Sequence, residues 1–335
     1  MSKKIAINGF GRIGKTFLRA VLSDPVASKK LDIVAINSGP GDVHLTAHFF
    51  KYDSSMGTYP EQVSMENNVL CVGDKRITIL TESDPQQLPW KILEVDWVVE
   101  ATGKFILKKD VEKHLNAGAK AVLITAPSSD PDCTIIPGVN DHTFDKTIHK
   151  VVSLGSCTTN ALVPLLHILH EAFSLTSVAM TTVHAYTNNQ VLLDQPGIDV
   201  RRSRAAALNM IPTTTGAMKV IGTLLPELDG KVSGLSLRVP VAKVSFLDLS
   251  FTAKEQISKD AIYKACVKAQ TGSLKNIIEV TDKPLVSSDF SGNSHSAIVD
   301  GLLIDHVEGI GKLFAWYDNE WGYSCRLRDF LVCCE

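Results

Sequence analysis

Residues 4–14 read KIAINGFGRIG and contain the pattern G-x-G-x-x-G at Gly9, Gly11 and Gly14. The apolar residues before it predict a strand, and residues 12–22 have the spacing of a helix. Between a strand and a helix, the three glycines permit a tight turn, close approach of backbone N–H groups to a pyrophosphate, and close helix packing. An ordinary glycine-rich loop is the alternative, and the context favours a dinucleotide site.

Alternating strands and helices continue around this turn. Residues 32–37, 95–101 and 121–126 are further apolar strand candidates, and residues 109–117 are helical in pattern. Such alternation predicts a Rossmann-type α/β domain, in which a parallel sheet binds the dinucleotide.

The pattern changes after about residue 155. A helix is predicted from Cys157 through residue 171, and long alternating runs at 235–241 and 244–252 are typical of antiparallel sheets. A strand at 312–318 and a helix at 321–332 follow. We therefore expect an α+β catalytic domain with a mostly antiparallel sheet.

Composition narrows the class of protein. The 335 residues are 44% hydrophobic and 21% charged, with a formal net charge of −2, which argues against a dedicated nucleic-acid partner. No apolar run reaches the ~18–20 residues that span a bilayer, and the N-terminus has no signal-peptide pattern. Seven cysteines without a C-x-x-C motif suggest neither a disulfide framework nor a structural metal site. We expect a cytoplasmic two-domain protein without a membrane partner.

The second predicted strand ends without a carboxylate. It runs into Ser38, and the next acidic residue is Asp42, whereas many dinucleotide sites place an acidic residue there to bind the ribose 2′-hydroxyl. Ser38 would not repel a 2′-phosphate. The site therefore either accepts NADP or is an NAD site with one hydrogen bond fewer.

A candidate nucleophile and a candidate base follow. Cys157 lies in SLGSCTTN at residues 153–160, at the start of an apolar helix, where the helix dipole favours a thiolate. His184 lies near the end of an apolar strand. Cysteine and histidine form the simplest activated-nucleophile pair, although the sequence does not show that they meet.

Candidate anion sites follow these two residues in the sequence. Arg202 lies in an arginine cluster, Arg238 lies inside an apolar strand, and residues 213–216 read TTTG. A buried guanidinium needs an anionic partner. A dinucleotide fold, a cysteine, a base and anion sites together suggest oxidation of a phosphorylated aldehyde.

These segments resemble the glyceraldehyde-3-phosphate dehydrogenases over essentially the whole chain. The SCTTN segment at 156–160 and WYDNEWGY at 316–323 are the most specific. Others that carry the resemblance are residues 8–14, 184–188, 201–207, 212–217 and 237–240.

The resemblance implies reversible phosphorylating oxidation of D-glyceraldehyde 3-phosphate to 1,3-bisphosphoglycerate, with NAD or NADP, in glycolysis or gluconeogenesis. It makes Cys157 the nucleophile, which forms a thiohemiacetal and then a thioester, and His184 the base. It assigns the substrate phosphate to Thr187 and Arg238, with Arg202 near both phosphates. It assigns the attacking inorganic phosphate to Ser156, Thr158, Thr215 and Gly216.

The resemblance also implies cofactor contacts and an assembly. The cofactor-binding residues would be Asn8, Gly9, Phe10, Gly11, Arg12, Ile13, Gly14, Ser38, Thr125, Tyr317 and Asn319, with Tyr317 beside the nicotinamide ring. A loop at about 185–207 would line a neighbouring subunit's site in a homotetramer. Residues 1–155 and 319–335 would form the dinucleotide-binding domain, and residues 156–318 the catalytic domain.

Four positions depart from the family pattern. Ser38 replaces the usual ribose-binding Asp, and Gln195 stands where NAD-specific members often have Leu, which resembles members that accept NADP. Ser83 replaces an Arg near the adenosine, and Ala161 replaces a second cysteine.

Two alternative functions remain. One is an erythrose-4-phosphate dehydrogenase, and the other is a dinucleotide-binding sensor or an RNA or surface binder without catalysis.

Overall fold

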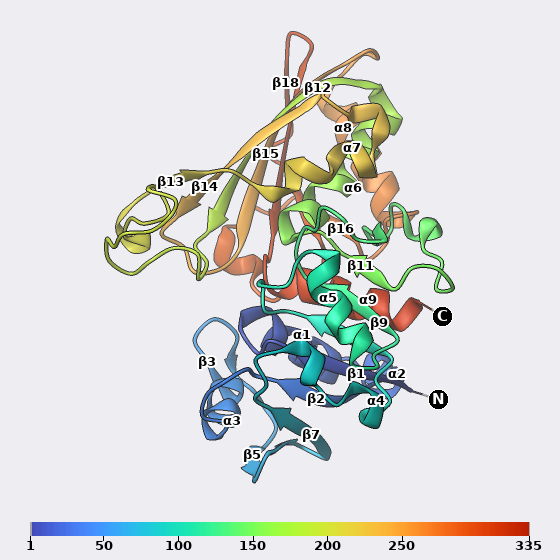
Figure 1. Cartoon of the computed structure of the whole chain (residues 1–335). Coiled ribbons are helices and arrows are strands. Elements are labelled where there is room, and N and C mark those ends of the chain that lie inside the picture. Colours follow the sequence, from blue (N-terminus) through green and yellow to red (C-terminus); the bar gives the residue numbers. More distant parts are fainter. Residues whose placement is uncertain (1, 335) are drawn as a thin grey trace. The chain divides into compact units, whose positions relative to one another are not determined.

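The computed structural model describes residues 2–334, which form two compact units (Figure 1). The first contains the residues up to Ile135, residues 142–155 and those from Ser324 onward, and the second contains Ile136–Asp141 and Ser156–Tyr323.

This division differs from the predicted one at residues 136–141 and 319–323, which belong to the second unit. The reason for 319–323 is local. Asn319 accepts a hydrogen bond from Ser245, and the backbone N–H groups of Glu320 and Trp321 donate to Asp318. Ile136 is buried in the hydrophobic core of the second unit.

The described part of the first unit contains a nine-stranded sheet in the order β10-β11-β9-β8-β1-β2-β7-β6-β5. The strands from β10 to β7 pair in parallel, as predicted for a Rossmann-type sheet, and β5 and β6 extend it antiparallel. Sequence reasoning missed this extension. The bounds are β1 Lys3–Asn8, β2 Leu31–Asn37, β5 Val63–Glu66, β6 Val69–Val72, β7 Lys75–Leu80, β8 Trp97–Glu100, β9 Ala121–Ile124, β10 Cys133–Thr134 and β11 Val151–Ser153.

Helix α1, Arg12–Leu22, follows β1 directly and buries Phe17, Leu18 and Val21. Asp24 caps α2, Pro25–Lys30, by accepting from two backbone N–H groups. The other elements before residue 156 are α3 His44–Lys51, β3 Tyr52–Asp53, β4 Gly57–Thr58, η1 Pro85–Gln87, α4 Trp90–Leu93, α5 Lys108–Asn116 and η2 Asp141–Thr143.

The described part of the second unit contains an eight-stranded, mostly antiparallel sheet, which confirms the predicted fold class. Its order is β13-β14-β12-β15-β19-β17-β16, with β18 paired to β19. The long strands β14, β12 and β15 run side by side in Figure 1, and β14 is parallel to β12. The bounds are β12 Leu175–Ala185, β13 Ile211–Thr213, β14 Val232–Val239, β15 Ser245–Ala253, β16 Ile278–Thr281, β17 Ala297–Asp300, β18 Asp305–Val307 and β19 Ile310–Tyr317.

Helix α6, Cys157–Phe173, is buried on most of its surface. It shares one core cluster with residues of the sheet such as Leu247 and Leu249, and with Ile262 of α8, Lys259–Thr271. Burial on all sides explains why its sequence is apolar almost throughout. Shorter elements are η3 Ala206–Leu208, η4 Gly216–Val220, α7 Ile221–Leu224, η5 Pro226–Leu228 and η6 Ser287–Phe290.

The last helix, α9 Trp321–Cys333, begins in the second unit and continues into the first. Its Phe330 ring meets Trp97 edge-on at 5.7 Å, and Lys3 Nζ donates to the Leu331 carbonyl at 2.8 Å. None of the helices within residues 2–334 combines the length and the apolar character needed to cross a lipid bilayer.

Candidate active site

The glycine turn of the first unit leaves open space beside its backbone. Gly9 has φ +93°, and a Cβ there would lie 2.6 Å from Thr102 N. A Cβ on Gly14 would lie 2.2 Å from the Gly9 carbonyl oxygen. A Cβ on Gly11 would meet nothing within 4 Å. The first and third glycines are therefore required for packing, whereas Gly11 borders a space that a ligand can enter.

The N-terminus of α1 has the character of an anion site. Gly11 is the N-cap and supplies no side-chain cap, and the first turn contains no acidic residue. The helix dipole and the first N–H groups therefore favour an anion there. Arg12 points its guanidinium at Asp53, at 2.5 Å. Together with the space beside Gly11, these features fit the phosphates of a dinucleotide.

A buried polar network, which sequence reasoning missed, lies beneath this turn. Glu100, at the end of β8, accepts from Asn8 Nδ2 at 2.5 Å, from Thr102 N at 2.8 Å and from the Thr102 hydroxyl. His114 Nε2 is 3.1 Å from the same carboxylate, and Trp90 Nε1 donates to His114 Nδ1 at 2.9 Å. The acidic residue that ends the apolar run WVVE was the available signal.

The end of β2 carries no carboxylate. Ser38 Oγ donates to the Leu80 carbonyl at 3.2 Å, and Asp42 accepts from His44 N at the exposed start of α3.

The other predicted cofactor residues of the first unit lie on different elements. Phe10 stacks on Phe50 with ring centroids 6.0 Å apart. Thr125, just after β9, donates to the Glu100 carbonyl, and Ile13 is half-buried in α1.

Cys157 is the first residue of α6. Ser156 caps the helix: its hydroxyl accepts from Thr159 N at 3.1 Å, and the Thr159 hydroxyl accepts from Ser156 N at 3.2 Å. This capping box fixes the start of the helix and hence the place of the thiol. The N–H group of Cys157 itself has no intrahelical acceptor, as at any helix start.

The structure brings the two predicted reacting side chains together. His184 lies at the end of β12, with its Nε2 3.6 Å from Cys157 Sγ. Burial raises the pKa of the Cys157 thiol, and the Arg238 cation partly opposes this. Burial, and then the same cation, lower the pKa of His184 to about 3. His184 Nε2 is therefore in position to accept the thiol proton.

Arg238 stands directly beside His184 because β12 and β14 pair in parallel with these two residues in register. Its Nη1 is 2.7 Å from His184 Nδ1 and 3.3 Å from the Ala185 carbonyl oxygen. Its Nε is buried and has no hydrogen-bond partner within the described residues. A half-buried guanidinium with an unused donor is a strong candidate for binding an anion.

Tyr317, for which the resemblance implies a place beside a nicotinamide ring, is 1% exposed. Its hydroxyl forms hydrogen bonds with the hydroxyl groups of Thr158 at 3.0 Å and Thr182 at 2.8 Å, and its ring meets the His184 ring edge-on. Tyr317 therefore holds the imidazole and the first turn of α6 in place.

The remaining predicted phosphate residues lie on loops of the second unit. Arg202 donates to the Thr214 carbonyl at 3.1 Å, which places it next to the 213–216 segment. Thr215 caps η4, and Gly216 is exposed. Thr187 shares a hydrogen bond with Gln190, and Asn319 accepts from Ser245.

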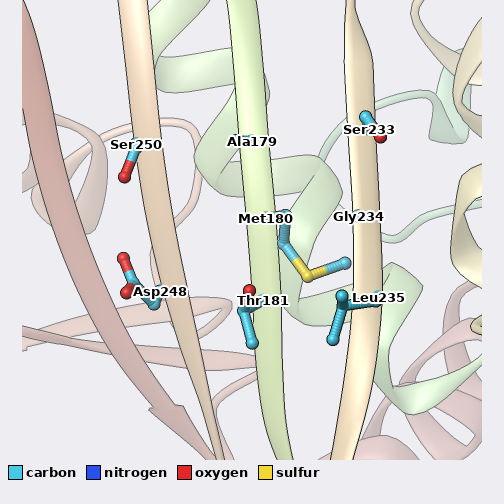
Figure 2. A pocket seen from close by; sticks show the side chains of 8 residues that line it. All are labelled: Ala179, Met180, Thr181, Ser233, Gly234, Leu235, Asp248 and Ser250. Carbon is cyan, nitrogen blue, oxygen red and sulfur yellow. The ribbon is translucent and has the colours of Figure 1, made fainter. Parts of the chain in front are cut away.

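A cavity of about 300 Å³ lies elsewhere in the second unit and contains none of these residues. Figure 2 shows its lining on the neighbouring strands β14, β12 and β15, with Met180 and Leu235 close together and the acidic Asp248 on the other side of Thr181. All seven cysteines are free thiols. Residues 2–334 contain no group of three or more His, Cys, Asp or Glu side chains placed to hold a metal ion.

Comparison with known proteins identifies the family. Residues 3–108 match the NAD binding domain of glyceraldehyde 3-phosphate dehydrogenase, and residues 156–319 match its C-terminal domain. The chain belongs to the glyceraldehyde-3-phosphate dehydrogenase family. It is 45% identical over 333 residues to glyceraldehyde-3-phosphate dehydrogenase 2 of Bacillus subtilis, covering 99% of this chain and 96% of the relative.

Two further members of the family are similar along nearly their whole length. The glyceraldehyde-3-phosphate dehydrogenase of Geobacillus stearothermophilus is 44% identical over 330 residues, covering 98% of this chain and 97% of the relative. That of Kitasatospora aureofaciens is 47% identical over 329 residues, covering 98% of each. Membership of this glyceraldehyde-3-phosphate dehydrogenase family makes the chain an oxidoreductase with a nicotinamide-dinucleotide domain.

Proposed function

We propose that this protein catalyses the reversible phosphorylating oxidation of D-glyceraldehyde 3-phosphate to 1,3-bisphosphoglycerate with NAD or NADP. The observation that carries the proposal is the placement of Cys157 Sγ 3.6 Å from His184 Nε2, at a helix start beside the Arg238 guanidinium. Family membership supplies the substrate class.

In the first step the Cys157 sulfur attacks the aldehyde carbon, and His184 Nε2 takes the thiol proton. The carbonyl oxygen receives that proton and becomes the hydroxyl of a thiohemiacetal. The N–H of Cys157 at the start of α6 is a suitable donor to the developing oxyanion, and one such donor is worth roughly 3 kcal/mol.

His184 then removes the hydroxyl proton of the thiohemiacetal, so that the carbonyl of a thioester forms. When bound, a nicotinamide dinucleotide would accept the hydride that leaves the same carbon. Burial and the Arg238 cation lower the pKa of His184, which favours the unprotonated imidazole that can accept this proton.

Inorganic phosphate next attacks the thioester carbonyl, and the Cys157 thiolate leaves and regains a proton from His184. We assign the substrate phosphate to Arg238 and Thr187. We assign the attacking phosphate to Ser156, Thr158, Thr215 and Gly216, with Arg202 near both. The Arg202–Thr214 contact supports this grouping, because it places a cation next to the 213–216 segment.

For the cofactor, we propose Gly9, Gly11 and Gly14 as the phosphate turn, with Asn8, Phe10, Arg12 and Ile13 around it. Ser38 and Thr125 lie at strand ends of the same unit, and we assign Asn319 to the carboxamide. We infer that NADP is accepted as well as NAD, because Ser38 replaces the family's usual ribose-binding Asp and Gln195 stands where NAD-specific members often have Leu.

We further propose a homotetramer. The segment 185–207 and the residues after it expose large apolar side chains to solvent: Leu192, Leu193, Ile198, Val200, Leu208 and Met210 are between 71% and 109% exposed. Such a surface favours contact with another subunit. Sedimentation at micromolar concentration should give the mass of four chains, and a stable monomer would contradict this assignment.

Phosphate dependence tests the reaction. NADH or NADPH formation from glyceraldehyde 3-phosphate should require inorganic phosphate and yield an acyl phosphate. Activity indifferent to phosphate would favour the erythrose-4-phosphate type, with water as acceptor. Binding of dinucleotide without any turnover would favour the non-catalytic alternative.

A side-by-side comparison of kcat/KM with NAD and NADP tests the cofactor proposal. We expect measurable use of both. Discrimination in favour of NAD above about 10³-fold, or roughly 4 kcal/mol, would contradict it.

A further inference from the structure

A path of hydrogen bonds links the end of β12 to Asn319, the residue that we assign to the carboxamide of the nicotinamide. The backbone N–H of Ala185 donates to Ser245 Oγ at 3.1 Å, and Ser245 Oγ donates to Asn319 Oδ1 at 3.3 Å. All three residues are buried. Because Ala185 directly follows His184, the path ties Asn319 to the strand that carries the base.

This path has a direction. A backbone N–H can only donate, so it uses a lone pair of the Ser245 hydroxyl and leaves the hydroxyl proton for Asn319. An amide oxygen accepts, so Oδ1 is the side of the Asn319 amide that faces Ser245. Nδ2 lies on the other side of the amide and, within residues 2–334, donates to no group. Asn319 therefore has an unused N–H donor, which is the group that a carboxamide oxygen needs.

The backbone just before Ser245 is held in an unusual conformation. Val244 has φ +67°, in the left-handed region that β-branched residues rarely adopt. Its side chain is buried in a cluster with Phe290 and Ile298, and surrounding packing of this kind is what holds an unfavourable backbone in place. Strand β15 therefore begins at a defined point, and Ser245 is its first residue.

The residue just before Asn319 is also fixed. Asp318 is buried, and its carboxylate accepts from three backbone N–H groups. Lys243 Nζ lies 3.1 Å from the same carboxylate, and both of these side chains are largely enclosed. The backbone that carries Asn319 therefore has little freedom. What remains is rotation of the Asn319 amide, and the hydroxyl of Ser245 restricts it.

We propose that Ser245 is a positioning residue for the cofactor: it turns the Asn319 amide so that Nδ2 donates to the carboxamide oxygen of the nicotinamide. In the flipped amide, Oδ1 would face that oxygen and repel it, because both are acceptors. Ser245 acts through Asn319 and is not itself a catalytic residue. The inference rests on the proposed function, to which the assignment of Asn319 to the carboxamide belongs.

The test compares the calorimetric binding of NAD with that of ADP-ribose, which has the same adenosine and pyrophosphate but no nicotinamide. In Ser245→Ala we expect the Kd of NAD to rise about tenfold, as for the loss of one oriented hydrogen bond. The Kd of ADP-ribose should stay at its wild-type value, because Asn319 does not contact that part of the cofactor. A purely structural role of Ser245 would instead weaken the binding of both ligands alike.

Further variants complete the test. Ser250→Ala, on the same strand, removes a hydroxyl that accepts from Lys312 and should leave both Kd values unchanged. Ser245→Cys keeps a weaker donor of similar size, so the Kd of NAD should rise by less than in the alanine variant, and it takes the place of that variant if Ser245→Ala does not fold. In an Asn319→Ala background, a substitution of Ser245 should weaken NAD binding no further, because Ser245 acts through the missing amide.

Equal losses for NAD and ADP-ribose, an unchanged Kd of NAD in the Ser245 variants, or additive losses in the double variant would overturn the role of Ser245. Phosphate-dependent NADH formation by the wild type is measured in parallel. If it is normal while the Ser245 variants bind NAD like the wild type, the inference is wrong and the proposed function stands. If Asn319→Ala also binds NAD like the wild type, the carboxamide assignment within the proposed function is wrong.

Discussion

Helices α1 and α6 each begin directly after a strand-to-helix turn. Their N-cap residues differ, and this residue decides what each helix start can bind or hold in place. The N-cap of α1 is Gly11, which provides no side-chain acceptor and borders open space. The N-cap of α6 is Ser156, whose hydroxyl is held in a capping box. The first helix start leaves its N–H groups available to an external anion. At the second, the capping box occupies the N–H of Thr159 and fixes the place of the thiol, while the N–H of Cys157 stays available to the reacting oxygen.

The comparison shows that a helix dipole does not specify a function by itself. At α1 we expect the ligand to approach the backbone N–H groups. The decisive feature there is that Gly11 has no side chain to block this approach. At α6 the dipole acts on a covalently attached group, and the neighbours of Cys157 decide what that group does.

The largest effect is expected at the start of α6. Cys157→Ser should abolish turnover, by about 10⁴-fold or more, because a hydroxyl is a far weaker nucleophile than a thiolate. Steady-state NADH formation at saturating phosphate measures it. Cys333→Ser, an exposed thiol at the end of α9, is the matched control and should retain full activity. Oxidation at the wild-type rate by Cys157→Ser would refute the mechanism.

His184→Asn tests whether the thiol at α6 depends on a base. We expect turnover to fall by ~10²–10⁴-fold, the usual contribution of a positioned general base. Single-turnover kinetics should place the loss in thioester formation. His167→Asn, which removes a histidine beside Glu171 on α6, should leave turnover unchanged. A His184 variant with normal rates would show that the dipole alone activates Cys157.

The start of α1 is tested by a pair of alanine substitutions. Gly11→Ala has room for its Cβ and a negative φ of −79°, so the protein should fold normally while dinucleotide affinity falls by ~100-fold, or about 2.8 kcal/mol. Gly14→Ala should instead destabilise the fold, because its Cβ would lie 2.2 Å from the Gly9 oxygen. Calorimetric binding and thermal unfolding separate the two effects. An unchanged dinucleotide affinity in Gly11→Ala would show that the open space beside Gly11 is not part of the binding site.

Glu100→Gln tests the network that supports the α1 turn without contacting a ligand. The amide would present a donor where Thr102 already donates, so we expect the free energy of unfolding to fall by ~1–3 kcal/mol and the dinucleotide Kd to rise about tenfold. Glu66→Gln, on the exposed edge strand β5, is the control. A Kd equal to the wild type would show that the turn holds its shape without Glu100.

The smallest effect is expected at the end of β2. Ser38→Asp should shift the ratio of kcat/KM for NAD over NADP by about fivefold toward NAD, because a carboxylate accepts from a ribose hydroxyl and repels a 2′-phosphate. Asp42→Asn, at the exposed start of α3, should not change the ratio. A shift toward NADP would show that the ribose lies elsewhere.

Local sequence was sufficient for the elements that carry the two helix starts. The apolar residues before Gly9 predicted β1, the glycines predicted the turn, and the spacing of residues 12–22 predicted α1. The apolar run after Cys157 predicted α6. Which strands pair with each other was harder to predict from the sequence. The alternating runs 235–241 and 244–252 are adjacent in the chain, but β12 lies between β14 and β15, since alternation specifies which face is buried and not which strand is the neighbour.

The residues alone were thus enough to predict the glycine turn, the helix that begins at Cys157 and the types of residue that carry the chemistry. These features depend on spacing within a single turn, strand or helix. The tertiary structure alone decided that His184, 27 residues from Cys157, reaches the thiol, and that Arg238, 54 residues from His184, reaches the other side of the ring. Such contacts depend on strand order, register and burial, which are set only when the whole core packs.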